Sequence, residues 1–146
     1  MLFRSIGVSR RIIVASPDFV RTHGEPRKPQ DLVGLPLVDA NEGPTQSVWR
    51  LSAGEADAYT LEFDARLAAG DFKTLLAATF AGVGAALLPN VECRADVEAG
   101  RLIRLLPEWG AADGVVHLVF TSRRSMLPGV RAVIDFAVAA LADAAQ

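Results

Sequence analysis

The chain has 146 residues, which is the length of a single domain, and its 51% hydrophobic and 22% charged residues exclude an intrinsically disordered chain. The formal net charge of −2 lacks the basic excess that usually marks a nucleic-acid-binding domain. A single cysteine, Cys93, excludes an intramolecular disulfide framework and a cysteine-only metal cluster, and it suits a reducing compartment.

The first elements in the chain are predicted to be a buried strand and a short helix. Residues 11–15 are apolar and β-branched, as in a parallel strand that is buried on both faces. Ser16 suits the N-cap of the helix that follows, Pro17 suits its first position, and Asp18 lies near the positive end of its dipole. Gly24 is predicted to end this helix.

The middle of the chain is predicted to contain three strands. Two of them, residues 35–38 and 48–51, flank a polar loop at residues 41–47. Residues 59–67 alternate between apolar and polar side chains, which predicts a third strand with one exposed face.

Asp71 is predicted to cap an amphipathic helix that Gly82 and Gly84 end. These two glycines follow a helix, whereas a dinucleotide-binding fingerprint opens one, so a tight turn is the better interpretation. The predicted apolar stripe of the helix consists of Phe72, Leu75, Leu76, Thr79, Phe80 and Val83.

The last part of the chain is predicted to contain three more strands, at residues 85–88, 102–106 and 115–120. Asn90 is predicted to cap the helix between the first two, and Pro128 to open the final helix. The predicted apolar stripe of the final helix consists of Val130, Val133, Ile134, Ala137, Val138 and Leu141. This alternation of strands and helices predicts an α/β fold with a mainly parallel sheet and some antiparallel additions.

Candidate catalytic residues are few. His23 suits a helix C-terminus, and His117 lies inside a predicted strand. Glu62 and Asp64 are expected on the solvent-exposed face of a strand. Cys93 is expected to be a small buried apolar residue rather than a thiol whose pKa a helix N-terminus lowers. Because no nucleophile–base pair, phosphate-binding loop or metal-ligand spacing is present in the sequence, we expect no catalytic residue, no metal and no cofactor.

The pattern does suit small-molecule binding, although helix capping alone explains it equally well. Helix N-termini that follow strands offer free N–H groups to ligands, and residues 16–18 and 70–72 are two such starts. The polar loop at residues 41–47 also follows a strand.

Six segments, in chain order, resemble LysR-type transcriptional regulators. Residues 11–20, RIIVASPDFV, are similar to the family's R-x-hydrophobic-hydrophobic-A-S-P-x-Y/F-L segment, and residues 71–89 end in the similar AGVGAALLP. The other four are PQDL at residues 29–32, Trp49 at a strand position where tryptophan is common, and the segments 96–106 and 116–137, the latter including the helix pattern of residues 124–137.

The resemblance implies the effector-binding domain of such a regulator, with a periplasmic-binding-protein-like fold of type 2. Residues 16–114 would form the second of its two lobes nearly completely, and residues 1–15 and 115–146 a remnant of the first. The helix-turn-helix head of the family has no counterpart, so the chain looks like a truncated gene product or a chosen piece of a longer protein. We expect a cytoplasmic effector sensor without catalysis, nucleic-acid contact or membrane contact. The alternative is a fragment of a solute-binding transport protein of the same fold, which the missing export signal disfavours.

The resemblance also implies an effector, which would be a small organic acid. Asp71 is a doubtful contact for such an anion, because like charges repel. The predicted effector-binding positions are Ser16, Pro17, Asn41, Glu42, Asp71 and Phe72. Because the strands at residues 11–15 and 117–121 would lack some of their sheet neighbours, we also expect self-association through the first-lobe remnant.

Overall fold

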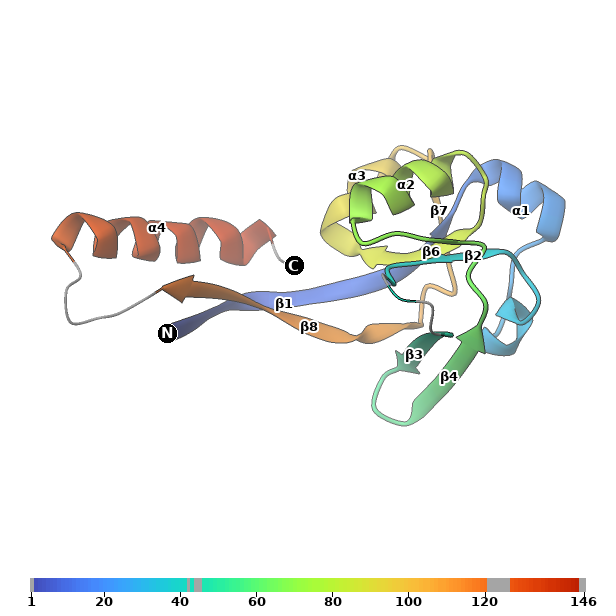
Figure 1. Ribbon diagram of the computed structural model, residues 1–146, viewed down its shortest axis with the longest axis horizontal. Coiled ribbons are helices and arrows are strands. Elements are labelled where there is room, and N and C mark those ends of the chain that lie inside the picture. The colour runs from blue at the N-terminus through green and yellow to red at the C-terminus, as the bar shows by residue number, and fades with distance from the viewer. Residues whose placement is uncertain (1, 42, 44–45, 121–126, 145–146) are drawn as a thin grey trace. The chain divides into compact units, whose positions relative to one another are not determined.

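The computed structural model describes residues 2–41, 43, 46–120 and 127–144, which form two compact units. Residues 11–112 form one, called the core unit, and residues 1–10 with 113–146 form the other, called the terminal unit (Figure 1). The division into two lobes expected from the sequence stays a prediction.

The order of the elements along the described residues alternates strands and helices, as predicted. The helices are α1 (Pro17–His23), the 3₁₀ turn η1 (Pro29–Leu32), α2 (Phe72–Phe80), α3 (Asn90–Glu98) and α4 (Pro128–Ala144). The strands are β1 (Leu2–Ala15), β2 (Leu37–Asp39), β3 (Ser47–Ala53), β4 (Asp57–Phe63), β5 (Leu67–Ala68), β6 (Ala85–Pro89), β7 (Ile103–Leu105) and β8 (Gly110–Phe120).

The strands form one mixed sheet in the order β4-β3-β8-β1-β6-β2-β5, with β7 paired to the end of β1. The prediction of a mainly parallel sheet is wrong: β1 pairs antiparallel with β6 and β7, and the parallel pairings described are those of β2 with β5 and β6. Both faces of the strand at residues 11–15 are covered, which agrees with its apolar sequence. Such burial does not require parallel neighbours. Residues 11–14 pair with β6 on one edge, and residues 13–15 pair with β7 on the other. The expectation that this strand lacks some of its sheet neighbours stays a prediction.

The core unit buries both faces of its central strands, β1, β2 and β6. Alternate side chains of β1 enter two different apolar clusters, with Ile13 in the first and Ile12 and Val14 in the second. The first cluster also contains Phe19 of α1 and residues of η1, β3 and β4, and the second contains residues of α2 and α3. Figure 1 shows α2 and α3 together on one side of β6.

Side-chain caps begin two of the helices as predicted. The hydroxyl oxygen of Ser16 accepts a hydrogen bond from the N–H of Phe19 at 3.1 Å, and Asp71 accepts from the N–H of Thr74 at 2.8 Å. The prediction for Asn90 is wrong. It is already the first residue of α3, because β6 runs through Pro89 directly into that helix and Pro89 holds the N-cap position without a side-chain bond.

The predicted strand at residues 59–67 is interrupted. Strand β4 ends at Phe63, and residues 67–68 form the separate strand β5, which pairs with β2. The alternation of apolar and polar residues continues past Phe63, so the pattern alone does not reveal the break.

Gly84 directly precedes β6 and lies close to Pro36, which directly precedes β2. A Cβ atom at this position would lie 2.9 Å from the carbonyl oxygen of Pro36, which is closer than real Cβ contacts. The next residue, Ala85, donates its N–H to that same oxygen at 3.1 Å. The absence of a side chain at Gly84 is therefore what lets β2 and β6 pair.

The predicted helix stripes are only partly buried. In α2, Leu75 and Thr79 are buried as predicted, but Phe72 and Phe80 are exposed. In α4, Ile134 is the buried residue of the described stripe, Ala137 and Val138 are half-buried, and the others are exposed.

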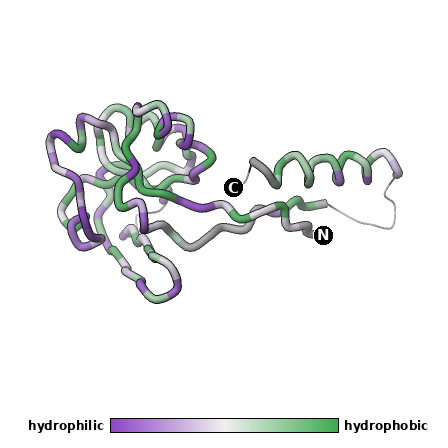
Figure 2. The backbone as a smooth tube through the Cα atoms, turned by 180° about the vertical axis from the view of Figure 1, so that it is seen from behind, coloured by the Kyte–Doolittle hydropathy of each residue, from purple (hydrophilic) through white to green (hydrophobic). Residues whose placement is uncertain are grey.

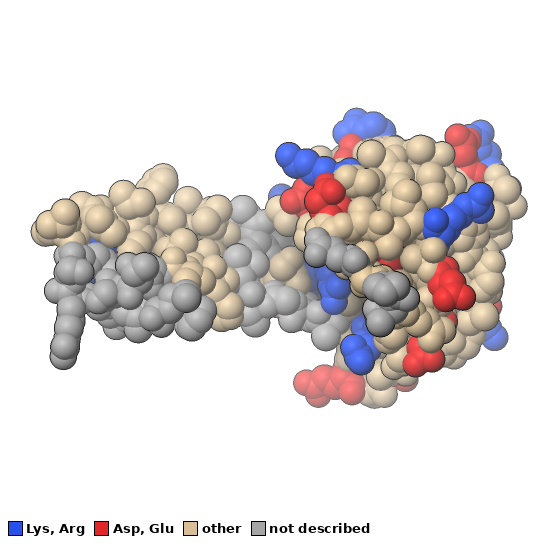
Figure 3. All heavy atoms as spheres, viewed as in Figure 1, with Lys and Arg blue, Asp and Glu red and all other residues tan. Residues whose placement is uncertain are grey.

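The terminal unit consists of residues 2–10 of β1, the second part of β8, and α4. Figure 2 shows α4 hydrophobic along most of its length, and Figure 3 shows few charged side chains on the face of α4 in view. Large apolar side chains of this unit that are exposed are Val8, Val119, Leu127, Val130, Val133, Phe136 and Leu141. Among the residues described, no helix has both the length and the apolar character needed to cross a membrane.

Candidate functional site

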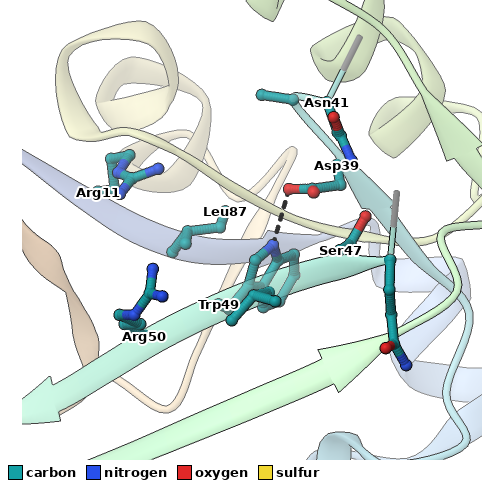
Figure 4. Close-up of a pocket in the computed structure, with 10 residues that line it drawn as sticks. Arg11, Asp39, Asn41, Ser47, Trp49, Arg50 and Leu87 are labelled. Carbon is teal, nitrogen blue, oxygen red and sulfur yellow. Dashed lines mark hydrogen bonds between the residues drawn. The ribbon is translucent and has the colours of Figure 1, made fainter. Parts of the chain in front are cut away.

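A cavity of about 430 Å³ opens in the core unit between the end of β2, the first half of β3, and the paired strands β1 and β6 (Figure 4). Its volume lies in the usual range for small-molecule sites. It is lined by Arg11, Asp39, Ala40, Asn41, Gln46, Ser47, Val48, Trp49, Arg50 and Leu87.

The cavity faces an edge of β3 as well as its side chains. One edge of β3 pairs with β4 along its whole length, whereas the other meets β8 only at Leu51 and Ser52 in the described pairings. The four consecutive residues 47–50 all line the cavity, although successive side chains of a strand point to opposite faces. The unpaired edge of β3 is therefore one wall of the cavity.

Trp49 forms the inner part of this wall. Its side chain is buried, its indole Nε1 donates a hydrogen bond to Oδ1 of Asp39 at 2.9 Å, and its ring packs edge-to-face on Phe63 at 4.9 Å. The hydrogen bond joins the end of β2 to β3 across the cavity (Figure 4). Trp49 and Asp39 therefore hold the two walls in register.

Two arginines give the cavity a positively charged end. Arg11 is half-buried and Arg50 is exposed, and neither guanidinium group forms a hydrogen bond or an ion pair with the residues described. Figure 4 shows both side chains on the side of Leu87 and Trp49 that is opposite Asn41 and Ser47. Because guanidinium groups bind carboxylates and phosphates through paired hydrogen bonds, two unneutralised arginines suit an anionic ligand.

A smaller hollow of about 200 Å³ adjoins this cavity and shares Asn41, Gln46 and Ser47 with it. Asp64, which follows β4, adds a carboxylate to its wall. The complete lining is Asn41, Gly43, Gln46, Ser47, Asp64, Ala65 and Ala68.

Of the six residues predicted from the sequence to bind the effector, Asn41 lines the cavity, and Glu42 lies outside the described residues, as do residues 44–45 of the same loop. Ser16 and Pro17 begin α1, and Asp71 and Phe72 begin α2; they line neither hollow. A role for these residues as effector contacts stays a prediction.

Asp71 acts as a helix cap in the structure. Its second oxygen accepts a hydrogen bond from the hydroxyl of Thr74 at 2.7 Å, in addition to the bond from the Thr74 N–H. The hydrogen bonds from Thr74, first that of the side chain and then that of the backbone, lower the pKa of Asp71.

Four charged or aromatic residues of the cavity were not predicted: Arg11, Asp39, Trp49 and Arg50. Asp39 ends β2, and the rule that ligands bind beyond the carboxyl ends of strands could have found it. Arg11 and Trp49 stand in segments that the family resemblance had already singled out. Nothing in the sequence indicates that Arg50 lines the cavity, because arginine is common on the exposed face of a strand.

The other titratable candidates lie elsewhere. Cys93 is buried in the second apolar cluster, and burial, with smaller contributions from Asp96 and Glu92, raises the pKa of its thiol to about 11. His23 and His117 are exposed. The part of the chain that the structure describes holds no group of three His, Cys, Asp or Glu side chains that could bind a metal ion.

Residues 2–142 match the protein-family model described as "LysR substrate binding domain". A putative transcriptional regulator of Pseudomonas aeruginosa is 28% identical over 127 residues, which are 86% of this chain and 42% of the relative. An HTH-type transcriptional regulator of Xanthomonas campestris is 28% identical over 145 residues, which are 97% of this chain and 42% of the relative. The chain thus spans less than half the length of these curated relatives.

Solved structures with a similar fold include regulatory domains of two proteins. The C227S variant of the AphB regulatory domain from Vibrio vulnificus superimposes with a TM-score of 0.81 at 27% identity, covering 94% of this chain and 68% of that domain. The CrgA regulatory domain from Neisseria meningitidis, described as a LysR-type transcriptional regulator, gives a TM-score of 0.81 at 23% identity, covering 96% of this chain and 68% of that domain.

Proposed function

The chain belongs to the family of LysR substrate-binding domains, and from that membership we propose that its cavity binds a small anionic effector. Its fold is the periplasmic-binding-protein-like fold of type 2, as expected from the sequence. In the proposed function, occupancy of the cavity is the signal that a transcription regulator of the cytoplasm responds to. The chain itself neither catalyses a reaction nor contacts nucleic acid or membrane. The transport-protein alternative is not favoured, because the relatives are transcription regulators.

The observation that carries the anionic class is the pair of arginines at one end of the cavity. Arg11 comes from β1 and Arg50 from β3, so two different strands bring their positive charges to one place. The two positive charges repel each other, and a nearby anion would offset this repulsion. No described acidic side chain forms an ion pair with either arginine. A carboxylate ligand would supply that anion, in agreement with the small organic acid expected from the sequence.

Titration of the ¹⁵N-labelled 146-residue chain with carboxylates (acetate, succinate, benzoate and salicylate) tests this function. The Trp49 indole N–H lies in the cavity wall, so we expect its resonance, identified by comparison with a Trp109→Phe variant, to shift with at least one acid. Arg50→Gln should weaken that binding about tenfold or more, since it removes a charged hydrogen-bond donor. Arg94→Gln, at an exposed arginine of α3 that lines neither hollow, is the matched control.

Two results would contradict the proposal. One is that no carboxylate-bearing molecule, whether one of these acids or an amino acid, moves the Trp49 resonance. The other is that Arg50→Gln and Arg94→Gln bind the acids equally well.

We further propose that the chain self-associates through the terminal unit. Strands β1 and β8 are neighbours in the sheet, and the described pairings of β1 with β6 and β7 involve none of residues 2–10. Open strand edges and exposed apolar side chains both promote association with a second chain. The sequence predicts an open edge on the strand at residues 117–121, of which Thr121 lies outside the described residues. Light scattering at tens of micromolar tests it, and a clean monomer would count against it.

A further inference from the structure

The cavity also contains a carboxylate that does not neutralise the arginines. Asp39 lines the same cavity as Arg11 and Arg50, yet it forms an ion pair with neither. Its Oδ1 atom accepts the hydrogen bond from Trp49, and the side chain is only half-buried. In the described part of the chain no donor is assigned to its other oxygen, Oδ2. The cavity therefore has a positive pole and, separate from it, a negative pole with an unused acceptor.

This separation of charge distinguishes between ligand classes. A ligand that carries only a carboxylate would bind between the arginines but would be repelled by Asp39 in the same cavity. A ligand that carries an ammonium group beside its carboxylate turns that repulsion into a charged hydrogen bond. The polar side chains of Asn41, Gln46 and Ser47 continue the cavity into the adjoining hollow, where Asp64 adds a second carboxylate.

We propose that the effector is a zwitterionic amino acid, whose carboxylate binds between Arg11 and Arg50 and whose ammonium group binds Oδ2 of Asp39. This inference rests on the proposed function, because it assigns the ligand class of the same cavity. The side chain of the amino acid extends past Ser47 toward the adjoining hollow, whose lining suits a polar group.

A matched set of small molecules tests the proposal on the 146-residue chain. Each of the twenty L-amino acids is titrated beside the carboxylic acid that lacks its α-amino group, and the Trp49 indole resonance reports binding. We expect at least one amino acid to bind about tenfold or more tightly than its partner acid.

Asp39→Asn is the informative variant, because an amide oxygen can still accept the hydrogen bond from Trp49 while the negative charge is gone. The ratio of the two affinities should then fall to about one, and loss of structure alone would lower both affinities together. Asp64→Asn removes a carboxylate from the adjoining hollow only, and it should keep the preference for the amino acid.

The outcomes separate this inference from the proposed function. If the partner acids bind as tightly as the amino acids, or if Asp39→Asn keeps the preference, the zwitterionic class is wrong while the anion site stands. If neither series moves the Trp49 resonance, the proposed function fails and this inference fails with it.

Discussion

In the core unit both faces of the central strands are covered, whereas in the terminal unit only Ile6 and Ile134 are buried among the described side chains. Strand β1 contributes to both units, with residues 2–10 in one and residues 11–15 in the other. The second part of this strand thus places its side chains in two apolar clusters, whereas its first part exposes Val8.

An apolar sequence therefore does not by itself bury a segment of this chain. Helix α4 is apolar along most of its length, but Val133 and Phe136 are 66% and 73% exposed. Apolar area stabilises a fold only when it leaves water, at roughly 25 cal/mol per Å². The core unit therefore provides most of the stability, and the exposed apolar side chains of the terminal unit add little to it.

Alanine substitutions at two isoleucines of β1 should differ most in their effect on the free energy of unfolding. Ile13 is fully buried in the first apolar cluster, so Ile13→Ala should lower the free energy of unfolding by about 2–5 kcal/mol. Ile6→Ala should change it by less than about 1 kcal/mol, because Ile6, although buried, belongs to the terminal unit and to neither apolar cluster of the core unit. Urea unfolding followed by tryptophan fluorescence measures the core unit, which contains both Trp49 and Trp109. Equal losses in the two variants would mean that the units unfold together and would end the comparison.

A smaller effect is expected for association. Phe136→Asp places a charge on the exposed face of α4, and we expect it to weaken self-association about tenfold, or about 1.4 kcal/mol, with little change in monomer stability. Phe80→Asp, at a phenylalanine of α2 that is 41% exposed in the core unit, is the matched control and should associate like the original chain. Sedimentation equilibrium measures both. If Phe80→Asp dissociates the chains and Phe136→Asp does not, the interface belongs to the core unit.

The smallest effect concerns the pH dependence of the core unit. The Thr74 hydrogen bonds hold the pKa of Asp71 below its ordinary value of 3.8. The ionised cap therefore stabilises the folded state above about pH 3.8, and this contribution is lost as the pH falls through the lower pKa of the folded state. The difference in melting temperature between the original chain and Asp71→Asn should accordingly be larger at pH 6 than at pH 2.5. Asp64→Asn, at a carboxylate without a described hydrogen bond, serves as the reference. A difference that does not change with pH would show that the charge of Asp71 is irrelevant to capping.

Local features of the fold were predictable from the sequence. The cap at Ser16, the cap at Asp71 and the start of α4 at Pro128 are confirmed, because each depends on side chains within one helical turn. Strand direction was not predictable, since Ile13 is equally buried beside an antiparallel or a parallel neighbour. The break between β4 and β5 was missed because the pairing of Leu67 with Val38 is a contact between distant parts of the chain.

The candidate site was less predictable from the sequence than the fold, because its residues come from distant parts of the chain. Asn41 follows directly from the rule about strand ends, but Arg11 and Arg50 line one cavity only because β1 and β3 both flank it. Arg50 has no local pattern that distinguishes it from an ordinary surface residue, and the segment around Arg11 does not indicate that Arg50 lines the same cavity. The charge arrangement of the cavity is a property of the tertiary structure.

The close approach at Gly84 has a consequence for engineering this cavity. Asp39 and Leu87, on opposite walls, belong to the two strands that meet there, so even alanine at position 84 would push apart the walls of any redesigned binding site. Libraries that aim to change ligand preference should vary residues 46–50, where β3 has an open edge, and keep position 84 as glycine.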